Sequence, residues 1–245
     1  MRPAELAKMF QLEDTYWWFV ARRELVRELL LRYRPAHDEI AVLDVGCGTG
    51  ATLKAIDDLG TALGIDRSPE ALQFCQTRGL SRLARATAEA LPVASGSVDV
   101  VLALDLLEHI QDDAAAAREL GRVLRPGGVL LVTVPAGPEL WSEHDEALAH
   151  LRRYRAARLR RILVDAGFDI QRLSPVITTL LLPIAALRLA QRIFPRKKGT
   201  PETAFIIPPR PINWLLTKIL RLERLWLRRF NLPVGVSLVA VARKP

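Results

Sequence analysis

The sequence predicts an α/β protein with a doubly wound, Rossmann-like sheet of seven mostly parallel strands and an antiparallel last strand. From residue 39 onward, short apolar runs rich in β-branched residues alternate with helical patterns, as parallel strands joined by helical crossovers require. The runs at 100–104 and 129–134 stay apolar without alternation, which is typical of strands covered on both faces. A glycine-rich turn at 46–50 directly follows the first predicted strand.

The predicted elements follow one another in a regular order. Strands are expected at 39–46, 61–66, within 81–92, at 97–110, at 129–135, in the second half of 157–174 and at 235–245. Helices are expected at 51–60, 68–79, 112–128 and in the first half of 157–174. We expect Gly60 to be a helix C-cap, and Ser68 followed by Pro69 to start the next helix.

Half of the 245 residues are hydrophobic, which is enough for one sizeable core. We divide the chain into three parts. Residues 1–38 are expected to form an N-terminal helical cap. Residues 39–174 and 233–245 form the core of the fold, and residues 175–232 form a basic, apolar helical insert before the last strand.

The net charge of +8 is concentrated in that insert. Residues 175–232 hold eleven basic and two acidic side chains, a local charge of +9, so the other residues sum to −1. A nearly neutral body with one basic segment disfavours nucleic acid as the main partner.

The two cysteines, Cys47 and Cys75, give neither a disulfide framework nor metal-ligand spacing. Residues 1–18 lack the apolar core of a signal peptide, and no run of eighteen apolar residues occurs. We therefore expect a cytoplasmic protein, which the basic insert could hold at the inner face of the membrane.

The stretch LDVGCGTG, residues 43–50, places Gly46, Gly48 and Gly50 at the carboxyl end of the first strand. Doubly wound folds bind ligands at this position, and a glycine lets the ligand lie against the main chain. The spacing is G-x-G-x-G, so the dinucleotide fingerprint G-x-G-x-x-G is not met. A nicotinamide-dependent oxidoreductase is therefore disfavoured.

Two acids lie beside this turn. Asp66 closes the second strand, where a carboxylate can accept hydrogen bonds from both ribose hydroxyls of an adenosine; the alternative is a turn or capping residue. Asp44 could hold an ammonium group or order the glycine loop.

With these motifs in place, the sequence resembles a known family. The succession LDVGCGTG, GID, AEALPVASGSVDVVLALDLLEHIQD and LGRVLRPGGVLLVTVP is similar to the small-molecule, type 11/12 branch of the class I S-adenosylmethionine-dependent methyltransferases. The resemblance covers residues 40–174 and 235–243. It implies that S-adenosyl-L-methionine is the cofactor and that it is bound by Asp44, Gly46, Cys47, Gly48, Gly50, Asp66, Arg67, Ala88, Glu89 and Asp105. Many relatives have an acid where Thr87 stands, so the adenine contact would rest on a backbone amide.

The N-terminal YWWFVARRELV also resembles a subset of this family in which such a helix caps the cofactor cleft. The resemblance implies that Tyr16, Trp17 and Arg22 or Arg23 meet the methionine carboxylate. The alternative is an aromatic helix that only packs on the core.

A hydroxyl acceptor must lose a proton during methyl transfer, and histidine is the usual proton acceptor. His109 follows the fourth strand, and His144 and His150 follow the fifth, all at the ligand-binding edge. Together with Tyr154 they are the candidate catalytic residues, and the sequence does not choose among them. No group of His, Glu and Asp shows a convincing metal spacing, so no metal is expected.

Nucleic-acid acceptors are disfavoured by two further comparisons. Enzymes that methylate amino groups of nucleic acids resemble one another in an Asn/Asp-Pro-Pro-aromatic motif after the fourth strand, where this chain has Asp105-Leu106-Leu107-Glu108. Enzymes that methylate the cytosine carbon need a thiol after a proline, and here Ala136 follows Pro135.

The insert contains an apolar stretch at 176–194, interrupted by Pro183, Arg188 and Arg192, and an amphipathic stretch at 212–230. On a helical wheel the second stretch gathers its basic residues on one face and Leu, Trp and Phe on much of the other. This pattern predicts a helix at an anionic membrane surface, contributed by residues 176–230. The alternatives are a lid over the site or a homodimer interface.

The sequence therefore predicts an S-adenosylmethionine-dependent methyltransferase acting on a small or lipid-like acceptor, with oxygen as the expected acceptor atom. A catalytically silent scaffold protein of the same fold and an RNA methyltransferase using the basic insert remain as alternatives. Methylation at carbon or nitrogen would need different help from the protein.

Overall fold

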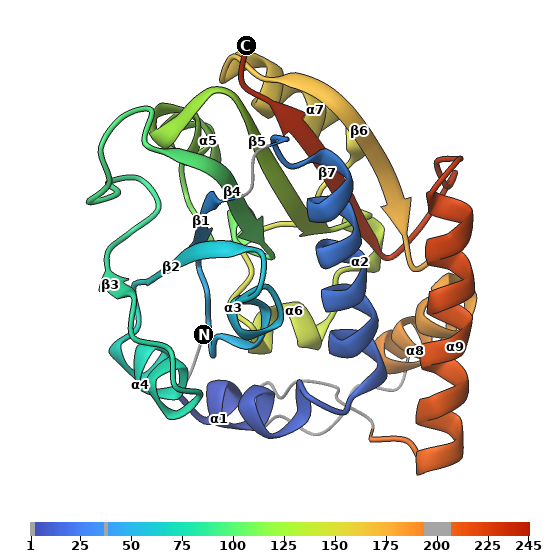
Figure 1. Ribbon diagram of the computed structural model, residues 1–245. Coiled ribbons are helices and arrows are strands. Elements are labelled where there is room, and N and C mark those ends of the chain that lie inside the picture. The colour runs from blue at the N-terminus through green and yellow to red at the C-terminus, as the bar shows by residue number, and fades with distance from the viewer. Residues whose placement is uncertain (1–2, 37–38, 194–206) are drawn as a thin grey trace.

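The computed structural model describes residues 3–36, 39–193 and 207–245. A seven-stranded sheet lies at its centre in the order β3-β2-β1-β4-β5-β7-β6 (Figure 1). The strands are β1 Ile40–Val45, β2 Gly60–Asp66, β3 Leu83–Arg85, β4 Val98–Leu104, β5 Leu124–Pro135, β6 Asp169–Val176 and β7 Ser237–Arg243. Every pairing from β3 to β5 is parallel, whereas β7 is antiparallel to both β5 and β6. The predicted fold class is confirmed.

Chain order reverses between β1 and β4, which are neighbours in the sheet. The connections after these two strands diverge from each other, and their divergence opens a crevice at the carboxyl ends of the strands. The fold thus places a binding site where the glycine-rich turn leaves β1.

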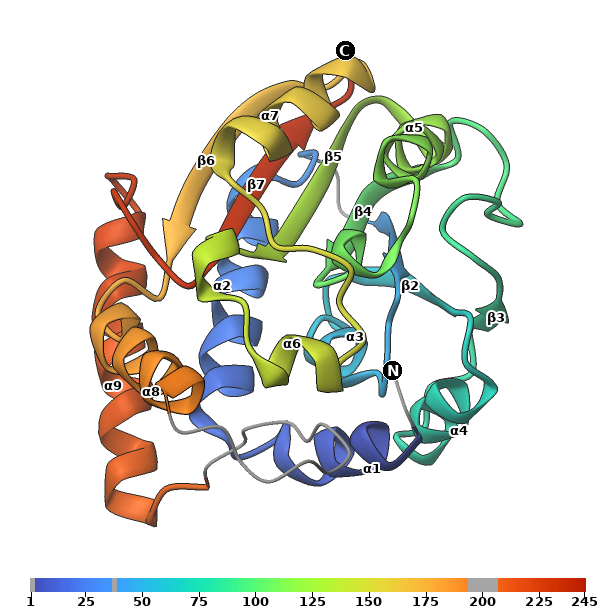
Figure 2. The ribbon, with the colours of Figure 1, turned by 180° about the vertical axis from the view of Figure 1, so that it is seen from behind.

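Helices cover both faces of the sheet (Figure 2). They are α1 Pro3–Leu12, α2 Trp17–Tyr33, α3 Ala51–Ala55, α4 Pro69–Thr77, α5 Asp113–Val123, α6 Glu143–Ala147, α7 Ala156–Asp165, α8 Leu181–Ile193 and α9 Arg210–Leu227, with short 3-10 turns η1 Leu107–His109 and η2 Pro138–Leu140. Successive residues of the central strands point to opposite faces of the sheet and pack in two different cores. Val101 packs in the core that includes residues of α5 and α7, and Val100 packs in the core that includes residues of α2 and α9. A strand buried on both faces needs this continuous apolar run.

Local signals in the sequence explain some of the element boundaries. Ser68 accepts a hydrogen bond from the Ala71 amide at 3.2 Å and Pro69 opens α4, as predicted. The prediction for Gly60 was wrong, because α3 ends at Ala55 and Gly60 begins β2. A Cβ at Gly60 would lie 2.2 Å from the carbonyl oxygen of Ile40, so close strand pairing explains the glycine.

The N-terminal cap and the insert pack against each other, although they lie at opposite ends of the chain. Helices α2 and α9 run side by side in Figures 1 and 2. Glu24 of α2 accepts hydrogen bonds from Arg221 at 2.9 Å and from Arg224 at 2.9 Å. Glu28 accepts one from Arg228 at 2.8 Å. The basic face of α9 was expected to face a membrane or solvent, but part of it is paired with acids of α2.

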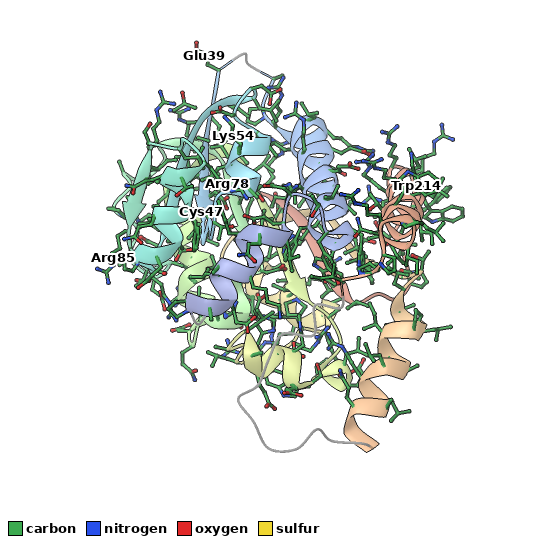
Figure 3. The ribbon with its side chains drawn as sticks, turned by 90° about the horizontal axis from the view of Figure 1, so that it is seen from below. Glu39, Cys47, Lys54, Arg78, Arg85 and Trp214 are labelled. Carbon is green, nitrogen blue, oxygen red and sulfur yellow. The ribbon has the colours of Figure 1, made fainter. Side chains whose placement is uncertain are left out.

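Besides the arginines that pair with α2, helix α9 has a buried side that includes Leu220 and Leu227. Many of its other apolar side chains are exposed. The exposed ones are Ile212, Trp214, Leu215, Leu222, Leu225 and Trp226, followed just after the helix by Phe230. Figure 3 shows Trp214 pointing outward from the helix. In the described part of the chain no helix is both long and apolar enough to cross a membrane. The basic residues at 196–198 lie outside the described residues.

Candidate active site

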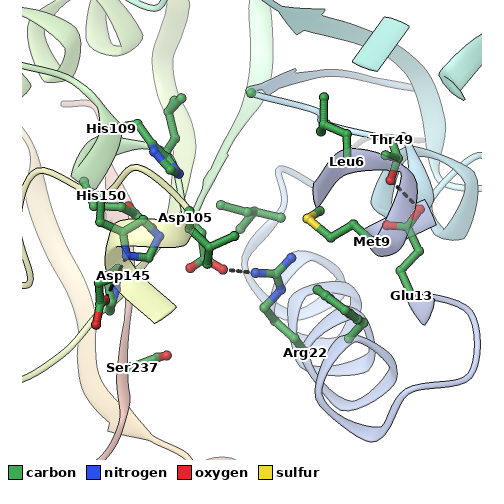
Figure 4. A pocket seen from close by; sticks show the side chains of 18 of the residues that line it. Leu6, Met9, Glu13, Arg22, Thr49, Asp105, His109, Asp145, His150 and Ser237 are labelled. Atoms are coloured by element: carbon green, nitrogen blue, oxygen red, sulfur yellow. Dashed lines mark hydrogen bonds and ion pairs between the residues drawn. The ribbon is translucent and has the colours of Figure 1, made fainter. Parts of the chain in front are cut away.

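A cavity of about 1180 Å³ lies at the carboxyl ends of β1, β2 and β4. Its walls come from the glycine-rich turn, from the N-terminal helices α1 and α2, from η1, and from α6 and α8. Figure 4 shows that Arg22, Asp105, His109 and His150 reach into the same space from different elements. The cavity therefore joins the N-terminal cap, the core and the insert.

The glycine-rich turn forms one wall by means of left-handed backbone. Gly48 has φ +56°, and a Cβ built on it would have no heavy atom within 4 Å, so its backbone faces open space. The Gly48 amide donates to Asp66 at 3.0 Å. Gly50 is not part of the cavity lining. A Cβ at Gly50 would lie 2.7 Å from Leu80 and 2.9 Å from the Cys75 sulfur, so this glycine permits helix packing rather than ligand contact.

Asp66 and Asp44 line the cavity beside the turn. The Asp66 carboxylate accepts hydrogen bonds from the amides of Gly48 and of Ser68, the latter at 2.8 Å, and still has lone pairs for further donors. Asp44 is almost completely buried. Burial raises the pKa of Asp44 to about 7; the negative charge of Asp66 adds to this rise, and the positive charge of Arg22 opposes it.

The N-terminal cap closes the cavity from the side of α2. Arg22 forms an ion pair with Asp105, which follows β4 in a left-handed conformation with φ 51°. Tyr16 and Trp17 also line the cavity. Arg23 lies outside the lining and donates to the carbonyl oxygen of Glu13. Of the two arginines that the sequence left open, Arg22 is the one at the cavity.

The opposite wall gathers His109, Glu108 and His150. The rings of the two histidines contact each other edge to face, with centroids 4.9 Å apart. His150 hydrogen-bonds through Nδ1 to the buried Asp145 at 2.9 Å, and its Nε2 lies 3.9 Å from a Glu108 carboxylate oxygen. Burial lowers the pKa of His109 to about 4 and raises the pKa of Glu108 to about 8. His109 is therefore a neutral imidazole at pH 7.

His144 also lines the cavity, and burial lowers its pKa to about 4. Tyr154 does not line the cavity. Its hydroxyl is buried in the core and donates to Asp113 at 2.8 Å, and burial raises its pKa above the ordinary value. The structure gives Tyr154 a structural contact in place of the expected catalytic position.

The other sequence-predicted residues that line the cavity are Gly46, Cys47, Arg67, Ala88 and Glu89. Ala88 is buried, and the segment that bears it is closed by a backbone bridge between Thr87 and Ala90. The predicted site therefore assembles at one place, with Gly50 and Tyr154 as the exceptions.

Sequence reasoning missed several charged residues of the cavity, among them Glu13, Glu108 and Arg188. Glu13 accepts a hydrogen bond from Thr49 and pairs with Arg78 at 2.6 Å. Arg188 brings α8 of the insert to Asp145 at 3.2 Å. The signal for Glu108 and Arg188 was a charge inside an otherwise apolar run.

Comparison with known proteins places this geometry in a family. Residues 43–132 match the family described as "Methyltransferase domain". The chain is 32% identical over 163 residues to a probable S-adenosylmethionine-dependent methyltransferase of Mycolicibacterium smegmatis, covering 65% of this chain and 62% of that one. It is 31% identical over 159 residues to one of Mycobacterium tuberculosis, covering 63% and 56%. Residues 43–132 therefore carry a methyltransferase domain, with the fold of the class I S-adenosylmethionine-dependent methyltransferases.

Solved methyltransferase structures share the fold of this domain. A possible histamine N-methyltransferase from Thermotoga maritima gives a TM-score of 0.64 at 19% identity, covering 99% of this chain and 96% of that one. Phosphoethanolamine N-methyltransferase 2 of Haemonchus contortus, solved with S-adenosyl-L-methionine, gives 0.58 at 21% identity and covers 91% and 52%. The chain spans about half to three fifths of the length of the curated relatives it matches.

The shape and the charges of the cavity fit S-adenosylmethionine. The open backbone at Gly48 leaves room for the methionine part, and the Asp66 carboxylate can accept from a ribose. Asp44 is a buried acid that lines the cavity, and an ammonium group would match its charge. Typical ligand pockets measure about 300–1,000 Å³, so a cavity of about 1180 Å³ can hold an acceptor as well.

Proposed function

We propose that the protein transfers the methyl group of S-adenosylmethionine to a small or lipid-like acceptor, with oxygen as the acceptor atom. The single observation that carries the proposal is the pairing of the open Gly48 backbone with Asp66 at the cavity wall. Calorimetry with S-adenosylmethionine tests the proposal, with NAD as the control ligand. Binding of NAD in preference to S-adenosylmethionine would support an oxidoreductase instead.

The cofactor supplies an activated methyl group, so the protein has to orient the acceptor, exclude water and receive a proton. In our proposal Asp66 holds the ribose and Asp44 the ammonium group. The ion pair between Arg22 and Asp105 ties the N-terminal cap across the cavity and limits the access of water. Tyr16 and Trp17 add apolar surface on the same side.

The wall formed by Glu108, His109 and His150 is the proposed place where a hydroxyl acceptor loses its proton. Neutral imidazoles can accept hydrogen bonds, and the low pKa of His109 keeps it neutral across the physiological range. His144 lies in the same cavity and is a further candidate. Methylation at oxygen rests on these histidines.

A lipid-like acceptor is favoured by the apolar residues that α8 and its neighbours present to the cavity. Ile184 and Leu187 of α8 and Leu216 of α9 line it together with Leu148 and Leu151. The insert is thus both a wall of the cavity and the carrier of the exposed apolar face of α9. An acceptor dissolved in a membrane could reach the cavity along this side.

We also propose that the exposed apolar face of α9 associates with an anionic membrane surface. Trp214 and Trp226 are more than half exposed, and aromatic side chains of this kind sit well at a membrane interface. Lys218 lies over the Trp214 ring at 5.4 Å and supplies a positive charge within the apolar face. The expected location is the cytoplasmic side of a membrane.

Sedimentation with vesicles of anionic lipid tests this association. The double variant Trp214→Ala/Trp226→Ala should lose most of its binding, whereas Val164→Ala, which truncates an exposed apolar residue on α7, should bind like the wild type. Equal binding by all three proteins would contradict the proposal. A dimer in solution that the double variant converts to monomers would assign the face to a second copy of the chain.

The two alternatives make different predictions. A silent scaffold of this fold would bind the cofactor but form no S-adenosylhomocysteine when mixed with a cell extract that keeps its lipid fraction. An RNA methyltransferase would need the basic residues of the insert, but Arg221, Arg224 and Arg228 are paired with acids of α2. Mass spectrometry of the extract for a species that gains one methyl group identifies the acceptor.

A further inference from the structure

Three side chains with metal-ligating atoms converge on the acceptor side of the cavity. Glu108 and His109 come from η1, and His150 comes from the loop after α6. One ligand atom from each lies within 4.8 Å of the other two. Because the residues come from separate parts of the chain, their spacing in the sequence gave no sign of this convergence.

Glu108 is the least expected member of the group. Its side chain is completely buried, and neither carboxylate oxygen has a hydrogen-bond partner among the described residues. A buried carboxylate without a partner is costly, so it needs either a proton or a cation. Arg22 and Arg153 are near enough to act on it electrostatically but neither donates a hydrogen bond to it.

The two histidines are oriented as metal ligands usually are. His150 turns Nδ1 to the Asp145 carboxylate at 2.9 Å, and Asp145 is itself held by Arg153 at 2.9 Å. His109 turns Nδ1 to the carbonyl oxygen of Ala149 at 3.2 Å. A carbonyl or an ionised carboxylate only accepts, so Nδ1 carries the hydrogen in both rings and Nε2 keeps a free lone pair. Such a hydrogen bond on the far side of the ring is the common support of a ligating histidine.

We propose that Glu108, His109 and His150 bind one divalent transition-metal cation, of the kind that prefers two imidazoles and one carboxylate. Ligand atoms stand about 2.0–2.2 Å from such a cation, so the three groups would draw closer together on binding. Zn²⁺, Co²⁺, Mn²⁺ and Fe²⁺ suit this donor set. The expectation that the chain holds no metal is replaced by this proposal.

The role of the cation rests on the proposed methyl transfer. The group lies in the same cavity as Asp105 and the glycine turn. A cation here would take the oxygen of a hydroxyl acceptor as a further ligand and lower the pKa of that hydroxyl. The hydroxyl proton then passes to water, the oxygen forms a bond to the methyl carbon, and the carbon–sulfur bond of the cofactor breaks. His109 and His150 act in this scheme as ligands.

Titration of the metal-free full chain with Zn²⁺ alone, followed by calorimetry, tests the proposal. We expect one equivalent to bind, and Co²⁺ to give the visible absorption of a site with nitrogen ligands. Glu108→Gln, which keeps the shape of the side chain, and His150→Ala should each weaken binding at least tenfold. His144→Ala is the matched control, since it removes a partly buried histidine that lines the same cavity but lies outside the group, and it should leave Zn²⁺ affinity unchanged.

The absence of Zn²⁺ and Co²⁺ binding, or equal affinity in the wild type, Glu108→Gln and His150→Ala, would overturn the inference. Circular dichroism of each variant separates loss of a ligand from loss of the fold. Calorimetry with S-adenosylmethionine is run on the same samples. Cofactor binding without metal binding would remove the metal site and leave the proposed function standing, and metal binding without cofactor binding would do the reverse.

Discussion

Arg22 of α2 forms an ion pair with Asp105, the residue that follows β4. The pair joins the N-terminal cap to the carboxyl end of a central strand across the cavity. Asp105 also accepts a hydrogen bond from the Thr133 hydroxyl at 2.9 Å and has a left-handed backbone. One carboxylate therefore supports both the cap and the local shape of the site.

Replacing Asp105 separates these two roles. Asp105→Asn keeps a residue type that tolerates the left-handed region but removes the charge, so affinity for S-adenosylmethionine should fall about tenfold with a small change in Tm. Asp105→Ala should also lose about 1 kcal/mol of stability from backbone strain. Calorimetry and urea denaturation measure the two effects. Unchanged affinity in both variants would remove the cap from the binding site.

Gly48→Ala tests the open backbone of the glycine turn. The new Cβ meets no protein atom within 4 Å but would occupy space proposed for the cofactor, so affinity for S-adenosylmethionine should fall more than tenfold. Gly79→Ala is the matched control, because Gly79 also has a positive φ and no neighbour within 4 Å, but lies outside the cavity lining. Both variants should lose about 1 kcal/mol of stability. Equal cofactor binding by the two would contradict our assignment of the turn.

The raised pKa of Asp44, about 7, predicts a pH dependence of cofactor binding. Only the ionised carboxylate attracts an ammonium group, so affinity should rise roughly eightfold between pH 6 and 7.5 as Asp44 loses its proton. Asp66 and Arg22 are the charged groups that face Asp44. Asp44→Asn should bind more weakly and flatten the profile, and a profile unchanged in this variant would assign the titration to another group.

The same shift predicts how stability changes with pH. The folded protein holds the Asp44 proton up to about pH 7, whereas the unfolded chain releases it near pH 4. Stability from this group is therefore lost as the pH rises from about 4 to 7. Asp44→Asn should lose less stability than the wild type over that range in urea denaturation, and parallel losses would contradict the raised pKa.

Tyr154→Phe tests the structural position of the Tyr154 hydroxyl. The variant loses the hydrogen bond to Asp113, which keeps its ion pairs with Arg152 and Arg158. Stability should fall by about 1 kcal/mol, and the rate of methyl transfer should stay within twofold of the wild type. A stable variant with a much slower rate would return Tyr154 to the catalytic group.

The sheet and most of the cofactor side of the cavity could be predicted, because their signals are local. A continuous apolar run such as 129–134 indicates a strand buried on both faces. Asp66 is the last residue of β2, and in this fold the carboxyl ends of the parallel strands form the ligand-binding edge. The boundary at Gly60 was missed, because a glycine that permits close strand pairing looks in the sequence like a glycine that ends a helix.

The acceptor side of the cavity could not be predicted, because it depends on contacts between distant segments. Asp145 forms an ion pair with Arg188 of the insert. Glu108 lies beside His150 in the folded structure although the two residues are far apart in the sequence. The helical wheel of residues 212–230 correctly predicted a basic face. It could not predict that an arginine of this face, Arg221, would form an ion pair with Glu24 of α2. Residue spacing carries no information about such partners.

The pairing of α2 with α9 has a consequence for biosynthesis. A ribosome makes α9 about two hundred residues after α2, so the acids of α2 have no arginine partners on α9 until α9 itself has been translated. A nascent chain without α8 and α9 would therefore lack one wall of the cavity. Ligand capture should begin only when the distal helix has emerged from the exit tunnel.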